Sequence, residues 1–185
     1  MVTMEQKKAY DRVMRVVNGS EEGFFFRYGH GGCSKIFIYN LMSAKVRSRG
    51  KIVLTVASSG IAPLLLINGR IAHSRFKILI TVDEYSTYNI RQGSLLAKLL
   101  IKIDLIIWDE APMLSRYCYE ALDICLRDII THASIANCER PFRGNVVVLG
   151  GDFRQILPII TRGSRQDIVH ATINSSYLWE FAEVM

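Results

Sequence analysis

The chain has 185 residues, of which 50% are hydrophobic and 22% charged, so it has the composition of one globular domain and is not a disordered chain. Lysine and arginine outnumber aspartate and glutamate by 23 to 17, giving a net charge of +6 and a pI near 9.3. This excess favours a polyanionic partner such as nucleic acid, although it also suits a solubilising surface. No apolar run reaches the roughly 18 residues of a membrane span, so we expect no membrane partner.

The first predicted element is a helix over residues 3–17, with apolar residues recurring near the helical period. Thr3 and Gln6 fit the capping box T-x-x-Q at its start. Gln6 has a second candidate role, because some nucleotide-dependent motors read adenine with a glutamine just upstream of their phosphate loop. From the local sequence, the cap is the favoured explanation.

A glycine-rich loop with a lysine follows a predicted aromatic strand over residues 24–28 and precedes a predicted helix over residues 35–46. Glycines at such a turn let backbone N–H groups point toward one anion, and the helix N-terminus favours negative charge. The alternative is a strand-to-helix turn that binds nothing. The candidate phosphate-binding residues are Gly29, Gly31, Gly32, Cys33, Ser34 and Lys35.

This loop departs from the phosphate-binding pattern G-x-x-x-x-G-K-[ST] at two positions. Ser34 replaces the last glycine, and Ile36 replaces the hydroxyl residue that coordinates Mg²⁺. A branched hydrocarbon offers no oxygen to a metal ion, so we expect magnesium binding to be impaired.

The rest of the chain alternates between predicted strands and helices. This order, with polar residues at the strand ends, predicts a doubly wound α/β domain with a mostly parallel sheet, whose ligand lies beyond the carboxyl ends of the strands. The predicted strands cover residues 51–57, 103–108 and the start of 145–159, with a further strand inside 76–85. The predicted helices cover residues 60–67, capped by Ser58 and Ser59, then 94–101, 115–132 and 175–185.

Polar groups stand at three of the strand ends. They are the glycine loop, the pair Asp109 and Glu110, and Asp152 with Gln155. Nucleotide hydrolysis needs Mg²⁺ on the phosphates, a carboxylate near the metal, and a group that orients or deprotonates water. Asp109 suits the metal role and Glu110 the base role, although an acidic pair can also be a helix-start charge.

Three stretches, ASSGIAPLLLINGRIAHSRF, LIIWDEAPM and VVVLGGDFRQILP, resemble the petite-integration-frequency helicases of superfamily one, especially their Helitron-type branch. The resemblance implies a RecA-like P-loop domain that uses ATP and Mg²⁺ to move 5′-to-3′ on single-stranded DNA, in repair, recombination or telomere maintenance. It assigns adenine reading to Gln6, the phosphates to Lys35, magnesium to Asp109, water activation to Glu110 and the γ-phosphate sensor to Gln155. Asp152 joins the nucleotide-binding set, and Ser58, Ser59, His73 and Ser74 match positions that face DNA.

The family helicases have two motor domains, and we expect residues 1–185 to be the first, cut off before the second. The alternative is a non-catalytic, single-stranded-DNA-binding remnant that keeps the fold. The resemblance implies a nuclear location, with mitochondria as the alternative. The sequence gives no signal of oligomeric state.

Overall fold

Six parallel strands form the central sheet of the computed structural model, whose described residues are 3–19, 21–29, 35–88, 90–131 and 141–185. The strand order is β3-β2-β4-β5-β1-β6, so β4 and β5 lie at the centre and the two-residue strands β3 and β6 at the edges. The strands are β1 (Gly23–Tyr28), β2 (Val53–Ala57), β3 (Arg70–Ile71), β4 (Leu105–Asp109), β5 (Val146–Gly151) and β6 (Glu183–Val184). All pairings are parallel, which confirms the predicted α/β class.

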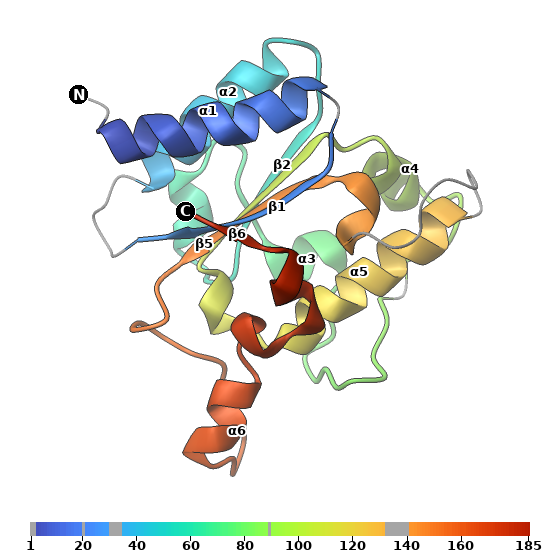
Figure 1. Ribbon diagram of the computed structural model, residues 1–185. Helices are drawn as coiled ribbons and strands as arrows, with labels where there is room; N and C mark the ends of the chain where they lie inside the picture. The colour runs from blue at the N-terminus through green and yellow to red at the C-terminus, as the bar shows by residue number, and fades with distance from the viewer. Residues whose placement is uncertain (1–2, 20, 30–34, 89, 132–140) are drawn as a thin grey trace.

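Helices cover both faces of this sheet (Figure 1). Helices α1 and α2 pack on one face, α3, α4 and α5 pack on the other, and α6 projects from the body of the domain. The helices are α1 (Met4–Gly19), α2 (Lys35–Arg47), α3 (Ala72–Phe76), α4 (Leu95–Ile101), α5 (Arg116–Thr131) and α6 (Arg165–His170). Among the described residues, no helix is long and apolar enough to cross a bilayer.

Two apolar cores result from the alternation of side chains along the strands. In β4, Leu105 and Ile107 face α1 and α2, whereas Ile106 and Trp108 face α3 and α5. Burial on both faces explains why these strands read as continuous apolar runs instead of alternating ones.

The N-terminal cap forms as the sequence predicts. The Gln6 N–H donates to Thr3 Oγ1 over 3.2 Å, and the Thr3 N–H donates to Gln6 Oε1 over 2.9 Å. Both orphan donors at the start of α1 are therefore satisfied.

Two predictions for the middle of the chain are wrong. Residues 76–85 contain no strand, because Phe76 is the last residue of α3 and Lys77 ends that helix with a φ of 55°. The helix expected over residues 60–67 is reduced to the 3₁₀ turn Ala62–Leu65. Ser59 Oγ accepts a hydrogen bond from the Ala62 N–H over 3.2 Å, whereas Ser58 caps nothing.

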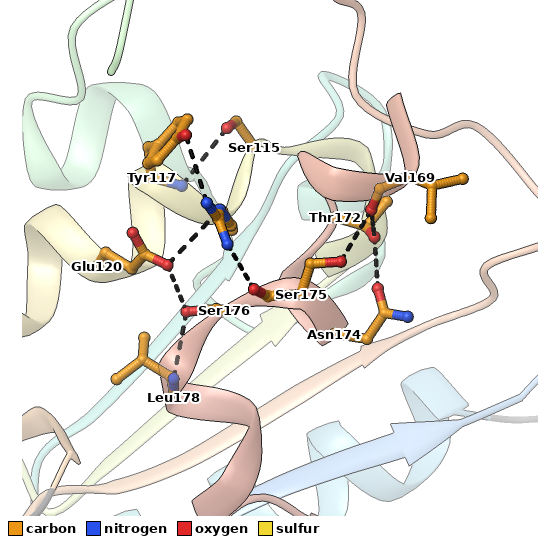
Figure 2. A network of polar contacts seen from close by, with 10 residues as sticks. Ser115, Tyr117, Glu120, Val169, Thr172, Asn174, Ser175, Ser176 and Leu178 are labelled. Atoms are coloured by element: carbon orange, nitrogen blue, oxygen red, sulfur yellow. Dashed lines mark hydrogen bonds and ion pairs between the residues drawn. The ribbon is translucent and has the colours of Figure 1, made fainter. Parts of the chain in front are cut away.

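The helix expected over residues 175–185 is also wrong. This segment forms the 3₁₀ turn Tyr177–Phe181 and then β6. Directly after β6, the Met185 N–H donates to Phe26 O over 2.9 Å. Polar contacts with α5 hold the segment in place (Figure 2), including Ser176 Oγ to Glu120 Oε1 at 2.7 Å. Backbone pairing with β1 and these contacts override a local pattern that resembles a helix.

Candidate nucleotide site

The carboxyl ends of β1, β4 and β5 meet at one edge of the sheet, with β5 in the middle. Tyr28 pairs with Gly151, and the Gly29 N–H donates to Gly151 O over 3.2 Å. Trp108 pairs with Leu149, so Asp109 also reaches this edge. The three polar strand ends expected from the sequence therefore lie side by side.

Lys35 is the first residue of α2 and is only 8% exposed. Its Nζ donates to Gly29 O over 2.5 Å, which bends the side chain back toward the end of β1. Gly31, Gly32, Cys33 and Ser34 lie outside the described residues, so the predicted phosphate loop is seen only at its two ends. The next side chain, Ile36, packs against the core under α1 and α2.

Asp109, the last residue of β4, is 2% exposed, and its Oδ1 has no hydrogen-bond partner among the described residues. Burial, and then the charge of Glu110, raises the pKa of this carboxyl from its ordinary value of 3.8 to about 6. Lys35 acts in the opposite direction, so the lysine and the carboxylate lie within electrostatic reach of each other. A buried carboxylate oxygen with no partner fits a divalent cation, which prefers oxygen ligands.

The described residues contain no group of three or more His, Cys, Asp or Glu side chains able to hold a metal ion. Magnesium sites in nucleotide enzymes use one or two carboxylates together with substrate phosphates, and Asp109 offers one such carboxylate.

Glu110 takes a left-handed backbone conformation, with φ 55° and ψ 37°. Such a conformation costs a non-glycine residue roughly 1–3 kcal/mol, and strain of this kind concentrates at functional sites. The turn Ala111–Met113 follows at once, and its Met113 N–H donates to Glu110 O over 3.1 Å. The side chain is partly exposed, so a water molecule can reach it.

Asp152 directly follows β5 and is 4% exposed. Its Oδ1 accepts hydrogen bonds from the Tyr28 hydroxyl over 3.0 Å and from the Arg154 N–H over 2.9 Å. Gln155 is exposed on the turn beyond, and its N–H donates to Asp152 O over 3.0 Å. Asp152 thus fixes the turn that carries Gln155.

A cavity of about 1010 Å³ opens beside Gly29, between α1, the end of β1 and β6. Gln6 lines it and is 8% exposed, because the capping box holds the glutamine against the body of the domain. The two sequence interpretations of Gln6 are therefore compatible. The capping box positions the residue, and its side chain borders a cavity large enough for a nucleotide. The other lining residues are Thr3, Glu5, Lys8, Ala9, Arg12, Arg27, Tyr28, Glu183, Val184 and Met185.

Comparison with known proteins places this geometry in a family. The model of the PIF1-like helicase family matches residues 1–185, the entire sequence. The chain belongs to the PIF1-like helicases. It is 32% identical over 146 residues to the ATP-dependent DNA helicase PIF4 of Trypanosoma brucei brucei, covering 75% of this chain and 17% of that protein. It is 29% identical over 155 residues to the ATP-dependent DNA helicase Pif1 of a Psychrobacter species, covering 83% of this chain and 22% of that protein.

Solved PIF1 structures share the fold. Bacteroides Pif1 in complex with ADP-AlF3 and single-stranded DNA superposes with a TM-score of 0.77 at 22% identity, covering 100% of this chain and 41% of that one. Candida albicans Pif1 superposes with a TM-score of 0.67 at 20% identity, covering 100% and 40%. These likenesses confirm the RecA-like P-loop architecture. The chain spans about a fifth of the curated relatives that it matches.

The four predicted DNA-facing residues of this PIF1-like chain lie toward the opposite edge of the sheet from the cavity, beyond β2 and on α3. Ser58 Oγ accepts from Trp108 Nε1 over 2.9 Å, and the Ser58 N–H donates to Asp109 O over 3.1 Å. His73 is half-buried and Ser74 exposed, and both belong to the helix α3. The structure does not bring these four residues together with Gln6.

Two contacts at the site were missed by the sequence interpretation. The Tyr28 hydroxyl bond to Asp152 joins residues 124 positions apart, and the Trp108 indole bond to Ser58 joins residues 50 positions apart. The only signal in the sequence was that each aromatic residue is the last or next-to-last residue of a predicted strand.

Proposed function

We propose that this chain is the nucleotide-binding motor domain of a DNA helicase that couples ATP hydrolysis to 5′-to-3′ movement on single-stranded DNA, in repair, recombination or telomere maintenance. The observation that carries the proposal is the pair of buried side chains Lys35 and Asp109, which act on each other by charge, at the edge that also holds Glu110 and Asp152. The Oδ1 of Asp109 has no partner among the described residues. The direction of movement and the pathways rest on the family resemblance alone.

Each residue has a defined task in this proposal. Lys35 neutralises phosphate charge, the N–H groups of the loop between Gly29 and Lys35 bind phosphate oxygens, and Gln6 reads the adenine from the cavity. Asp109 holds magnesium, which supplies charge neutralisation on the phosphates. Glu110 takes the proton of the attacking water, and Gln155, on the turn fixed by Asp152, senses the γ-phosphate.

Contact with DNA is proposed for Ser58, Ser59, His73 and Ser74. The backbone bond between Ser58 and Asp109 gives a direct mechanical link between the nucleotide and DNA sides of the sheet. A shift of β4 on nucleotide binding therefore moves Ser58 as well. The basic side chains Arg70, Arg75 and Lys77 near α3 add favourable charge for a phosphate backbone.

The same proposal includes slow turnover by this chain. Ile36 contributes no oxygen to magnesium, and its side chain is used in the core instead. PIF1-family motors also take arginine fingers from a second motor domain, and such a finger contributes roughly 10³–10⁵ in rate in comparable enzymes. We therefore expect nucleotide binding with little hydrolysis from residues 1–185.

A second candidate function is favoured by the packing of Ile36. A non-catalytic module that keeps the fold and binds single-stranded DNA needs no hydroxyl at that position. Salt-sensitive binding to single strands, together with no detectable nucleotide binding, supports this second function.

Equilibrium binding of a fluorescent ATP analogue tests the first function. Lys35→Ala should weaken binding by about tenfold or more, because a charged hydrogen bond to phosphate contributes roughly 1.5–3 kcal/mol. Lys45→Ala is the matched control, since Lys45 is exposed on the last turn of the same helix. Equal losses in both variants, or no binding by the unaltered chain, contradict the proposal.

A further inference from the structure

Tyr39 lies on α2 and is 0% exposed, yet its hydroxyl has no hydrogen-bond partner among the described residues. A buried hydroxyl without a partner costs roughly 1–3 kcal/mol. A phenylalanine would fill the same space without that cost, so the hydroxyl calls for an explanation.

The hydroxyl lies above a row of residues that crosses the sheet. The register pairs Ala57 with Asp109 and Arg27 with Gly150, while Asp109 and Gly150 directly follow the paired Trp108 and Leu149. The alternation of the strands turns this row toward α2, the side of Ile107 and Val148. Asp109 and Arg27 therefore flank Gly150 on the face that Tyr39 covers.

Gly150 leaves the space that Tyr39 occupies. A Cβ added at Gly150 would lie 1.6 Å from the Tyr39 hydroxyl oxygen. The hydroxyl therefore rests directly over the middle strand, between a carboxylate and a guanidinium. Its pKa is raised well above the ordinary value, first by burial and then by the charge of Asp109, while Arg27 lowers it.

Asp109, within this row, also has a buried atom without a partner among the described residues, its Oδ1. Neighbouring strands are about 4.8 Å apart, a spacing that one water molecule can bridge between a hydroxyl over Gly150 and a carboxylate on β4. Two buried polar atoms that lack partners, one over β5 and the other at the end of β4, fit a pair bridged by water.

Lys35 and Tyr39 are four residues apart on α2, so they project from the same face of the helix. That face presents an ammonium group and a hydroxyl to the row on the sheet. Lys35 is already coupled to Asp109 by charge, and Tyr39 lies one turn further along.

We propose that Tyr39 is a positioning residue for Asp109, whose hydroxyl donates through one ordered water to Asp109 Oδ1 and orients the carboxylate for a divalent cation. The inference rests on the proposed nucleotide-binding function and assigns Tyr39 no contact with the nucleotide itself. Groups that orient a metal-binding side chain typically contribute 10- to 100-fold in metal affinity.

The test compares the ADP affinity of the unaltered chain and of Tyr39→Phe, each with and without Mn²⁺, by titration with a fluorescent ADP analogue. Mn²⁺ replaces Mg²⁺ as the probe because it binds such ligands more tightly. Tyr39→Phe should leave the metal-free affinity unchanged and reduce the gain from Mn²⁺ by about tenfold. Its melting temperature should change little, because the variant keeps the ring in place and removes only one water-mediated hydrogen bond.

Tyr88→Phe is the matched control, because Tyr88 is a buried tyrosine in the opposite core whose hydroxyl donates to Cys118 O. This variant should lose stability and keep the full gain from Mn²⁺. Two results for Tyr39→Phe overturn the inference and leave the proposed function standing. One is an increase in ADP affinity on adding Mn²⁺ that equals that of the unaltered chain. The other is an equal loss of ADP affinity with and without Mn²⁺. ADP binding that no Mn²⁺ strengthens in the unaltered chain overturns the inference too, and no ADP binding at all overturns both.

Discussion

The Tyr28 hydroxyl donates a hydrogen bond to Asp152 Oδ1 over 3.0 Å and thereby joins the end of β1 to the turn after β5. One partner precedes the glycine loop, and the other fixes the turn that carries Gln155. This hydrogen bond directly connects the two parts of the candidate site that we propose to contact the phosphates.

Replacing Tyr28 with phenylalanine removes this connection. We expect the free energy of unfolding to fall by about 1 kcal/mol, the usual contribution of a partly buried hydrogen bond, and ADP affinity to fall with it. Urea unfolding and equilibrium binding measure the two effects. Tyr85→Phe is the control because Tyr85 is 84% exposed, and the account is wrong here if both variants behave alike.

Stability should depend on pH through Asp109. Its pKa is about 6 in the folded chain against an ordinary 3.8, so ionisation is less favourable in the folded state. The resulting destabilisation is absent below about pH 4, grows as the pH rises through the window between these values, and stays constant above about pH 6. At neutral pH it amounts to at most about 3 kcal/mol.

Asp109→Asn removes this dependence because an amide does not titrate. We expect the variant to be more stable than the unaltered chain at pH 7 and to lose that advantage by pH 4. Urea unfolding of both proteins across this range isolates Asp109, since the other groups cancel in the difference. Parallel stability profiles would contradict the assigned burial of the carboxylate.

Gly150→Ala should destabilise the fold by about 2 kcal/mol or more, since the added Cβ meets the Tyr39 hydroxyl at 1.6 Å. Adding Tyr39→Phe should restore part of the loss, although the ring carbon at 2.8 Å still crowds the site. A double-mutant cycle measured by thermal unfolding gives the coupling energy between the two positions. Strictly additive effects would place the hydroxyl elsewhere.

The four core strands were predictable because burial on both faces gives each a short, mainly apolar run, as in LIIW of β4. The short edge strands were not. β3 and β6 have two residues each and exist through backbone pairing with a distant strand, which leaves no periodic pattern. The apolar run over residues 76–85 was wrongly predicted to contain a strand. Phe76 and Ile78 are buried there, but they pack into the core without pairing with another strand.

The residues of the candidate site also differ in how far the sequence indicates them. Asp109, Glu110 and Asp152 were predictable from their position at strand ends. The role proposed for Tyr39 was not predictable, because it depends on Gly150 and Asp109, which lie on two other elements. Nothing near Tyr39 in the sequence distinguishes it from an ordinary core aromatic residue.

Asp123 should contribute strongly to the stability of the fold, although it lies outside the candidate nucleotide site. It is fully buried on α5 and accepts hydrogen bonds from Arg127 Nε over 2.8 Å, the Tyr177 hydroxyl over 2.9 Å and the Phe142 N–H over 2.5 Å. Asp123→Asn should cost about 3 kcal/mol in chemical unfolding, because the amide cannot accept from all three donors. Asp128→Asn, exposed on the same helix, should change stability by less than about 0.5 kcal/mol.

We propose that this PIF1-like chain binds nucleotide and that Ser34 and Ile36 weaken its use of magnesium. ATP-analogue affinity should be measured with and without Mg²⁺, for the unaltered chain and for Ser34→Gly combined with Ile36→Thr. We predict that both proteins bind more tightly with Mg²⁺ and that the double variant gains about tenfold more than the unaltered chain, because a hydroxyl restores an oxygen ligand. Equal gains in the two proteins, or no nucleotide binding by either, would contradict the claim.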